Sequence, residues 1–173
     1  MSDPPEAPSR TVAQLLALAI EAGCLTFREY IPWADDIIAR LDHPPAWICE
    51  LSTTKYRPHA LRVVRDFVHS EPFEEFKDAT EDYLGFLWIR YERGEVSWAT
   101  FLDEAGQYSD AANGAIECEY FYSMLNELEE AEFDPGIENR QREEVQQRLS
   151  EAIVRTRAFY ENIRTTRWQA GGE

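Results

Sequence analysis

Apolar residues recur along most of this chain at spacings of three and four, the period of an α-helix that buries one face. The first such run, 12–20, is followed by Gly23 at the position of a C-terminal cap. The second opens with a capping-box sequence, Thr26–Glu29, and Pro58 fits the first turn of another helix. No stretch keeps the strict apolar–polar alternation of a half-buried strand. The pattern therefore predicts an all-α protein.

The same periodicity predicts helices in the second half of the chain at 72–93, 98–107, 115–132 and 138–168. Ser97 is a suitable N-cap, and the short link before it favours an antiparallel helix pair. The predicted fold class is all-α: a single-domain irregular helical bundle of about seven or eight helices with a long C-terminal helix. We expect residues 11–168 to form this domain, between a disordered leader at 1–10 and a disordered tail at 169–173.

The segment Tyr83–Tyr91 is apolar except at Gly85 and Arg90, so it has no polar face to turn toward water. We therefore expect this helix to form the core. Gly85 in its middle indicates the close approach of a neighbouring helix. In the last helix a narrow seam close to a 3.5-residue period consists of Val145, Leu149, Ala152, Thr156, Phe159 and Ile163.

Composition limits the class of protein. The chain has 173 residues, 44% of them hydrophobic, and its 22 aromatic residues provide too much core material for a disordered chain. Three widely spaced cysteines exclude a disulfide scaffold. A net charge of −16 argues against direct binding to nucleic acid or to an anionic membrane, because both attract bases. The N-terminus lacks the pattern of a signal peptide, so we expect a cytoplasmic protein.

The chain carries no motif that names a reaction, whether a dinucleotide-binding glycine motif, a P-loop, a nucleophile elbow or a zinc-protease helix. Asp66 and His69 have the spacing of half a di-metal carboxylate site, but neither of the two Glu-x-x-His motifs that such a site needs is present. His43 and His59 lack a spacing partner. No catalytic residue, metal site or cofactor is predicted, and an enzyme is the less favoured interpretation.

One pair of charges falls on apolar helix faces. With 100° per residue, Glu117 lies in the middle of the apolar arc of its predicted helix, and Arg90 lies on the apolar side of the helix before it. An unpaired buried charge costs several kcal/mol. We therefore expect Arg90 and Glu117 to pair inside the bundle. The alternative is that Arg90 extends to solvent along its stem while Glu117 lies at a rim.

The negative charge is unevenly distributed. Residues 94–139 contain 12 acids and no Lys or Arg. Four of these acids crowd a predicted helix C-terminus, where the helix dipole disfavours anions. Tyr122 falls outside the apolar arc and is the candidate aromatic anchor beside them. The predicted partner-binding residues are Tyr122, Asp103, Glu104, Glu127, Glu129, Glu130 and Glu132. Plain solubility and halophile-type acidity are the alternatives.

Three classes of function fit these observations. In its short, acidic, helical character the chain resembles bacterial immunity proteins, although no motif assigns it to them. That resemblance implies a cytosolic inhibitor that masks a basic protein partner. The alternative is a self-associating adaptor, a possible homodimer through the C-terminal helix, whose residues Arg155, Arg157, Arg164 and Arg167 dock on a second copy. The third, less favoured class is a metal-dependent helical-bundle enzyme.

Overall fold

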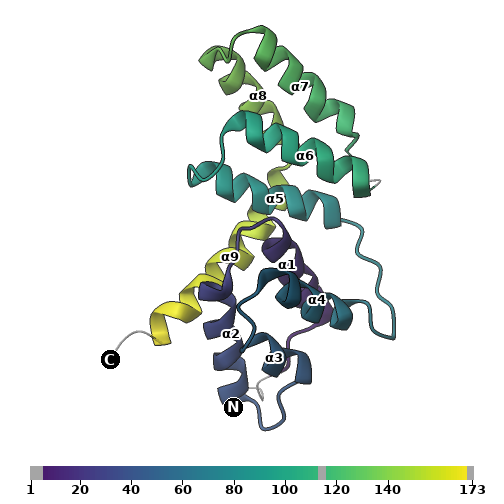
Figure 1. The fold of residues 1–173 in the computed structure, drawn as a ribbon, viewed down its shortest axis with the longest axis vertical. Coiled ribbons are helices and arrows are strands. Elements are labelled where there is room, and N and C mark those ends of the chain that lie inside the picture. Colours follow the sequence, from purple (N-terminus) through teal and green to yellow (C-terminus); the bar gives the residue numbers. More distant parts are fainter. Residues whose placement is uncertain (1–5, 113–115, 171–173) are drawn as a thin grey trace. The chain divides into compact units, whose positions relative to one another are not determined.

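The computed structural model describes residues 6–112 and 116–170, with side chains as far as Thr166 (Figure 1). The described part of the chain is all-helical, which confirms the predicted fold class. It contains nine helices: α1 (Arg10–Glu21), α2 (Phe27–Arg40), α3 (Ala46–Leu51), α4 (Arg57–Val68), α5 (Ala79–Glu92), α6 (Trp98–Ala112), α7 (Cys118–Glu130), α8 (Pro135–Arg148) and the long α9 (Ser150–Ala170).

The chain divides into two compact units. Unit 1 comprises residues 1–77 and 158–173, so it contains α1–α4 and the second part of α9. Unit 2 comprises residues 78–157, so it contains α5–α8 and the first part of α9. The single domain expected for 11–168 stays a prediction.

In unit 1, local sequence signals set the helix ends and aromatic side chains fill the interior. Thr26 forms the predicted capping box at the start of α2, and Gly23 has a φ of 73°. Trp47 stacks on Phe67 with ring centroids 4.8 Å apart. The buried Tyr30 hydroxyl donates to the Thr54 carbonyl at 2.7 Å, so its one polar atom is satisfied.

In unit 2, α5 is buried from Asp82 through Ile89, as expected for a helix without a polar face. The predicted close approach at Gly85 is also confirmed. A Cβ built on this glycine would lie 2.6 Å from Thr156 Oγ1 and 3.0 Å from the Ala152 carbonyl oxygen. The first turns of α9 therefore pack directly on the α5 backbone. Next to α5, α6 packs on both α5 and α7 (Figure 1).

The structure corrects the predicted start of this helix. α5 begins at Ala79, not at residue 72, and Phe73 is 74% exposed in the segment before it. A longer helix would have aligned Glu74, Asp78 and Asp82 at successive i, i+4 positions, where like charges repel. The observed boundary keeps only Asp82 inside the helix and leaves Asp78 at the N-cap.

The structure also divides the predicted helix 138–168 into α8 and α9. The break is at Leu149, whose φ of −96° and ψ of 11° depart from helical values. Leu149 is itself buried, as are Val145, Ala152 and Thr156, so unit 2 covers this part of the seam with its own helices. The division also explains why the helices exceed the seven or eight expected.

The terminal predictions fall partly outside the described residues. Residues 6–9 have no regular structure, and α1 begins at Arg10. At the other end α9 extends to Ala170, so residues 169 and 170 are helical and not part of a disordered tail. Residues 1–5 and 171–173 lie outside the described range.

Candidate functional site

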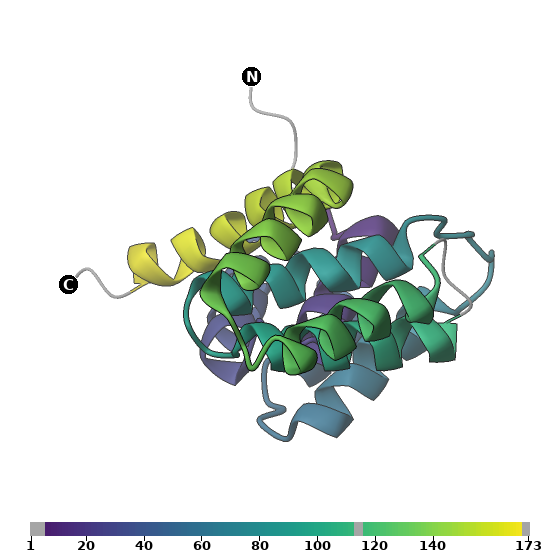
Figure 2. The same ribbon diagram turned by 90° about the horizontal axis from the view of Figure 1, so that it is seen from above.

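A groove in unit 2 lies between α7 and α8, is largely open to solvent and has a volume of about 810 Å³. Figure 2 shows α8 diverging from α7 beyond the turn that joins them. The α7/α8 groove is lined by Glu117, Glu119, Tyr120, Ser123, Met124, Glu127, Gln141, Glu144 and Arg148. Four carboxylates and one guanidinium thus surround a tyrosine ring and a methionine. The groove combines negative charge with an aromatic surface, which is the chemistry that recognises cationic side chains.

Tyr120 provides the aromatic surface of this groove. Its hydroxyl donates to Glu144 Oε1 at 3.1 Å, and the Arg148 guanidinium carbon lies 4.4 Å from the centroid of its ring. Burial, followed by the charge of Glu144, raises the pKa of Tyr120 to about 12. The hydroxyl therefore stays a neutral donor at physiological pH. The ring already holds one guanidinium, supplied by an exposed side chain of the same chain.

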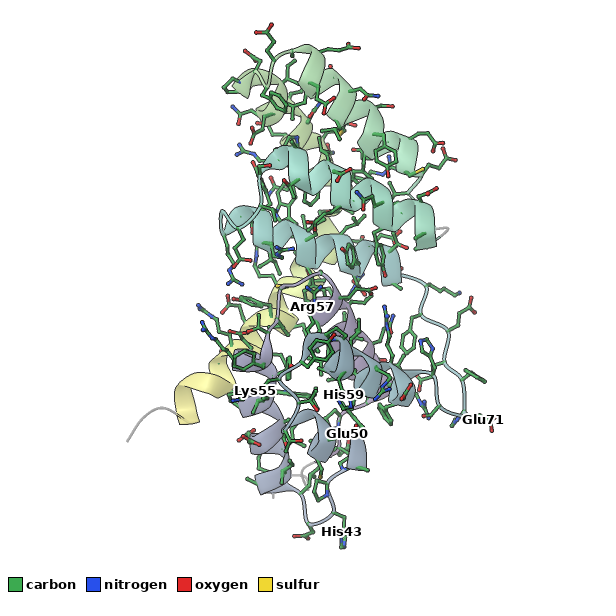
Figure 3. The ribbon with its side chains drawn as sticks, in the orientation of Figure 1. His43, Glu50, Lys55, Arg57, His59 and Glu71 are labelled. Carbon is green, nitrogen blue, oxygen red and sulfur yellow. The ribbon has the colours of Figure 1, made fainter. Side chains whose placement is uncertain are left out.

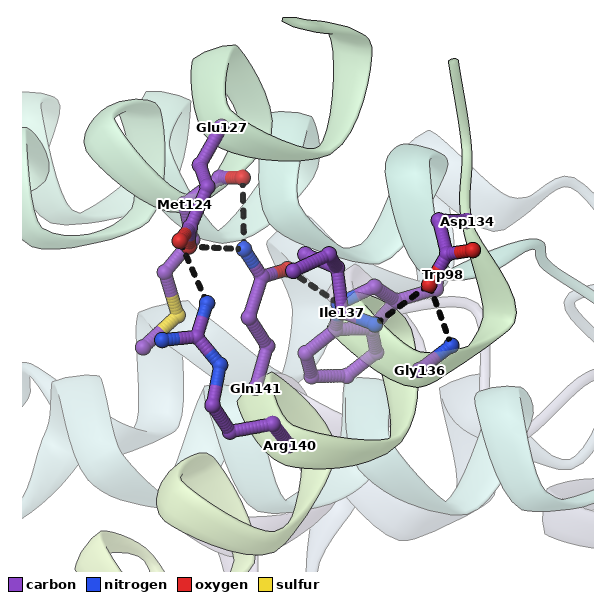
Figure 4. Close-up of polar contacts among 8 residues, drawn as sticks. All are labelled: Trp98, Met124, Glu127, Asp134, Gly136, Ile137, Arg140 and Gln141. Carbon is purple, nitrogen blue, oxygen red and sulfur yellow. Dashed lines mark hydrogen bonds and ion pairs between the residues drawn. The ribbon is translucent and has the colours of Figure 1, made fainter. Parts of the chain in front are cut away.

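The wall of the groove is fixed by Gln141, which is buried on α8 (Figure 4). Its amide oxygen accepts from Trp98 Nε1 at 3.0 Å. Its amide nitrogen donates to the Met124 carbonyl at 2.9 Å and to Glu127 Oε2 at 2.8 Å. One side chain therefore joins α6, α7 and α8, with its donors and acceptor satisfied.

The turn between α7 and α8 sets the direction of α8. Glu132 and Phe133 both have positive φ values, 51° and 61°, and the Phe133 amide donates to the Leu128 carbonyl at 2.8 Å. Asp134 then caps α8 by accepting from the Gly136 and Ile137 amides (Figure 4). This local geometry starts α8 along a new direction and thereby places Gln141 and Glu144 opposite α7.

The predicted acidic surface separates into structural and exposed members. Glu127 forms an ion pair with Arg140 and accepts from Gln141, and the Arg140 hydrogen bond is the main reason that its pKa is lowered. Glu129, Glu130 and Glu132 are exposed at the C-terminal end of α7. These three are accordingly the members of the cluster whose side chains face solvent.

The two predicted acids on α6 also have partners within unit 2. Asp103 accepts from Gln107 Nε2 at 2.8 Å. Glu104 lies 3.5 Å from Arg90 across the α5–α6 pair. Both side chains are half-buried, so they support the helix packing and present less charge to solvent than the three acids at the end of α7.

The structure corrects the assignment of Tyr122 as an exposed anchor. Its ring packs against Gly106 of α6: a Cβ built on Gly106 would lie 2.6 Å from Tyr122 Cε1. The side chain is half-buried, and burial is the first cause of its raised pKa. A helical wheel cannot show this contact, because it ranks the faces of one helix by hydrophobicity. The glycine on the neighbouring helix has no side chain and leaves room for the Tyr122 ring outside the apolar arc.

The structure also corrects the predicted buried pair. Glu117 is exposed. It is the N-cap residue of α7, with an extended backbone, because the helix begins only at Cys118. Arg90 instead lies 3.4 Å from Glu95 and 3.5 Å from Glu104. The wheel placed Glu117 on an apolar face only because it assumed a helix that started earlier.

The three histidines lie in unit 1, and Figure 3 labels two of them, His43 and His59. His59 Nε2 is 2.9 Å from Glu50 Oε1, whereas His43 is on the turn before α3 and His69 caps the end of α4. Within the described residues, no group of three or more His, Cys, Asp or Glu side chains is arranged to hold a metal ion. The Asp66–His69 spacing therefore has no further ligands around it in the described range.

The arginines of α9 have partners in the same chain. Arg155 Nη2 lies 2.6 Å from Asp82, Arg157 pairs with Glu92 at 2.5 Å, and both contacts are inside unit 2. Arg164 lies 3.1 Å from Glu161. The side chain of Arg167 is outside the described set. Three of the four arginines expected to dock on a second copy, Arg155, Arg157 and Arg164, are thus engaged with this copy's acids, and the homodimer stays a prediction.

Of the groove lining, the sequence singled out only Glu117 and Glu127, and it missed the other residues, among them Tyr120, Gln141, Glu144 and Arg148. Tyr120 falls in the apolar arc of its predicted helix, which favours a core position, and residues 140–148 contain Val145 as their one apolar residue, which favours a solvated stretch. Glutamine and arginine on a polar helix carry no signal that distinguishes a structural role from a solvated one.

Comparison of the chain with protein-family models, with curated proteins and with solved structures finds no match. Among the described helices, none combines the length and the apolar character that crossing a bilayer demands.

Proposed function

We propose that this protein binds and masks a basic protein partner through unit 2, in the manner of an immunity-type inhibitor. The observation that carries the proposal is the division of charge between the units. Unit 2 holds 19 acids and seven bases, a net charge of −12, whereas unit 1 holds 14 acids and ten bases, a net charge of −4. Repulsion among so many acids lowers the stability of a compact unit. Binding a partner of opposite charge would offset this cost, which gives the charge a function.

The contact surface is centred on Glu129, Glu130 and Glu132. They are exposed, and they lie at or just beyond the C-terminus of α7, where the helix dipole disfavours negative charge. Acids at the rim of an interface mainly accelerate encounter with a basic partner. The half-buried acids of the predicted set act by holding unit 2 together.

The test reverses those three acids to Lys together. Glu127 is left intact because its replacement would break the Arg140 and Gln141 contacts and confuse folding with binding. The matched control reverses Asp66, Glu74 and Glu75, three exposed acids of unit 1, and so changes the net charge equally.

Partners retained by the immobilised wild-type protein at low salt are identified, and their association rates are then measured with purified components at rising salt. We expect the unit 2 reversal to reduce the association rate at least tenfold at low salt and weakly at high salt, and the unit 1 reversal to have a smaller effect. If the association rates change neither with salt concentration nor with the unit 2 reversal, the acidic surface is only a solvated face.

A further inference from the structure

We infer that the α7/α8 groove is a binding site for an arginine side chain of the basic partner, with the Tyr120 ring as its platform. This inference rests on the proposed function and adds the residue type that is recognised. Two independent observations point to it: the groove is lined by four carboxylates, and a guanidinium, that of Arg148, already lies on the aromatic ring inside it.

The position of Arg148 shows what the groove accepts. Its guanidinium carbon is 4.4 Å from the Tyr120 centroid, within the range of a cation–π contact. A planar guanidinium stacks on an aromatic face and binds carboxylates through paired donors, whereas a lysine ammonium is a compact and strongly hydrated charge. The groove thus distinguishes arginine from lysine by the shape and hydration of the cationic group, since both side chains carry the same charge.

Arg148 is also placed to leave. It is exposed at the C-terminal end of α8, so its side chain turns outward without opening the core. An incoming arginine would take its place on Tyr120, beside Glu144, whose Oε1 accepts from the Tyr120 hydroxyl, and near Glu117 and Glu119, which are exposed at the start of α7. Arg148 is then an internal competitor that occupies the ring until a partner side chain displaces it.

The remaining lining keeps the site open. Gln141 and Glu127 are bound to each other and to neighbouring helices, so their positions do not depend on a ligand. Met124 is buried and gives the groove an apolar surface that adapts to the methylene stem of a long side chain. The preformed walls limit the ordering that binding requires.

The experiment compares a hexa-arginine peptide with a hexa-lysine peptide on the full chain, by titration calorimetry at fixed salt. We expect the wild type to bind the arginine peptide at least threefold more tightly. Arg148→Ala should increase affinity for the arginine peptide about threefold or more, because the ring is vacated. Tyr120→Leu should remove the preference for arginine and leave lysine-peptide affinity within about twofold.

The controls separate this inference from the proposed function. Gln147→Ala, an exposed change on α8 outside the groove lining, should alter neither affinity. Thermal unfolding monitors the folding of Tyr120→Leu, and the exposed Arg148→Ala variant provides an independent test if that variant is unfolded.

Equal affinities for the two peptides that neither variant changes would overturn the groove site. If the unit 2 reversal still weakened both peptides in that case, the proposed function would stand without the groove. If neither peptide bound and no partner responded to the reversal, both would fail.

Discussion

Gln141 shows how one buried amide determines the packing of three helices. Its oxygen accepts from Trp98, and its nitrogen donates to Met124 and Glu127, which leaves no polar atom of the side chain without a partner. A buried group of this kind contributes less through the bonds it forms than through the penalty that follows when one partner is removed.

Gln141→Ala should lower the free energy of unfolding by about 2–3 kcal/mol, because the Trp98 N–H would be left buried without a partner, and Glu127 and the Met124 carbonyl would each lose a donor. Urea unfolding followed by circular dichroism measures this change. Gln147→Ala, on the exposed side of the same helix, should change it by less than about 0.5 kcal/mol. Equal effects would mean that the Gln141 contacts add nothing.

Asp82 is a buried carboxyl that pairs with Arg155, whose Nε donates to it at 2.8 Å. Burial raises the pKa of Asp82 above its ordinary value and outweighs the lowering by Arg155. Between the ordinary pKa of aspartate and the raised value, the folded state therefore binds more protons than the unfolded state. The Asp82 contribution to the free energy of unfolding falls as pH rises through that window and is constant above it.

Carbon-13 NMR of the Asp82 carboxyl should consequently give a titration midpoint above the ordinary value of an aspartate. Asp82→Asn should remove the matching pH dependence from the urea unfolding curve. A midpoint below the ordinary value would mean that pairing with Arg155 outweighs burial.

At the scale of elements, the close contact between α5 and α9 depends on Gly85, which has no side chain. Gly85→Ala adds a methyl group that would lie 2.6 Å from Thr156 Oγ1 and 3.0 Å from a backbone oxygen of Ala152. Overpacking of this kind costs about 1–3 kcal/mol, whereas alanine gains at most about 1 kcal/mol over glycine inside a helix, so we expect a net loss of stability.

Unfolding of Gly85→Ala should therefore begin at lower urea concentration than that of the wild type. The double variant with Thr156→Ala should recover part of the loss, because two of the three nearest atoms belong to the Thr156 side chain. A more stable Gly85→Ala variant would show that α9 moves away from α5 at little cost.

At the scale of the whole molecule, most of the negative charge is confined to residues 78–157. The net charge of this unit is −12, compared with −4 for the remaining residues. Intramolecular ion pairs such as Arg155–Asp82 and Arg140–Glu127 neutralise only part of it. The exposed acids outside these ion pairs repel one another. Salt screens this repulsion beyond a Debye length of about 10 Å at 0.1 M.

The melting temperature should rise when sodium chloride is increased from about 0.02 to 0.3 M, since screening relieves repulsion between exposed acids. The triple lysine reversal of Glu129, Glu130 and Glu132 should flatten this dependence more than the equal reversal in unit 1. Differential scanning calorimetry measures both. A melting temperature that falls with salt would mean that attractive ion pairs outweigh the repulsion.

The sequence by itself determined the features that arise from neighbours within about four residues. The helical class, the core helix around Tyr83–Ile89, the Thr26 capping box and the left-handed Gly23 all follow from periodicity and capping, which are local. The asymmetry of charge was likewise visible as 12 acids without a base from 94 to 139. The run of acids is a local feature, so the sequence shows it. The sequence does not show which of these acids face solvent and which are bound by side chains far away in the chain.

The tertiary structure decided which side chains meet. Gln141 reaches Trp98 across 43 residues and Arg155 reaches Asp82 across 73, separations over which periodicity carries no information. Periodicity also gives no information on the contact of the Tyr122 ring with Gly106 or of Arg148 with the Tyr120 ring. It does not predict the helix break at the buried Leu149 either. Each depends on the direction in which one helix leaves a turn and packs on another. Composition and pattern specify the helices, and only the packing of their faces selects the contacts between them.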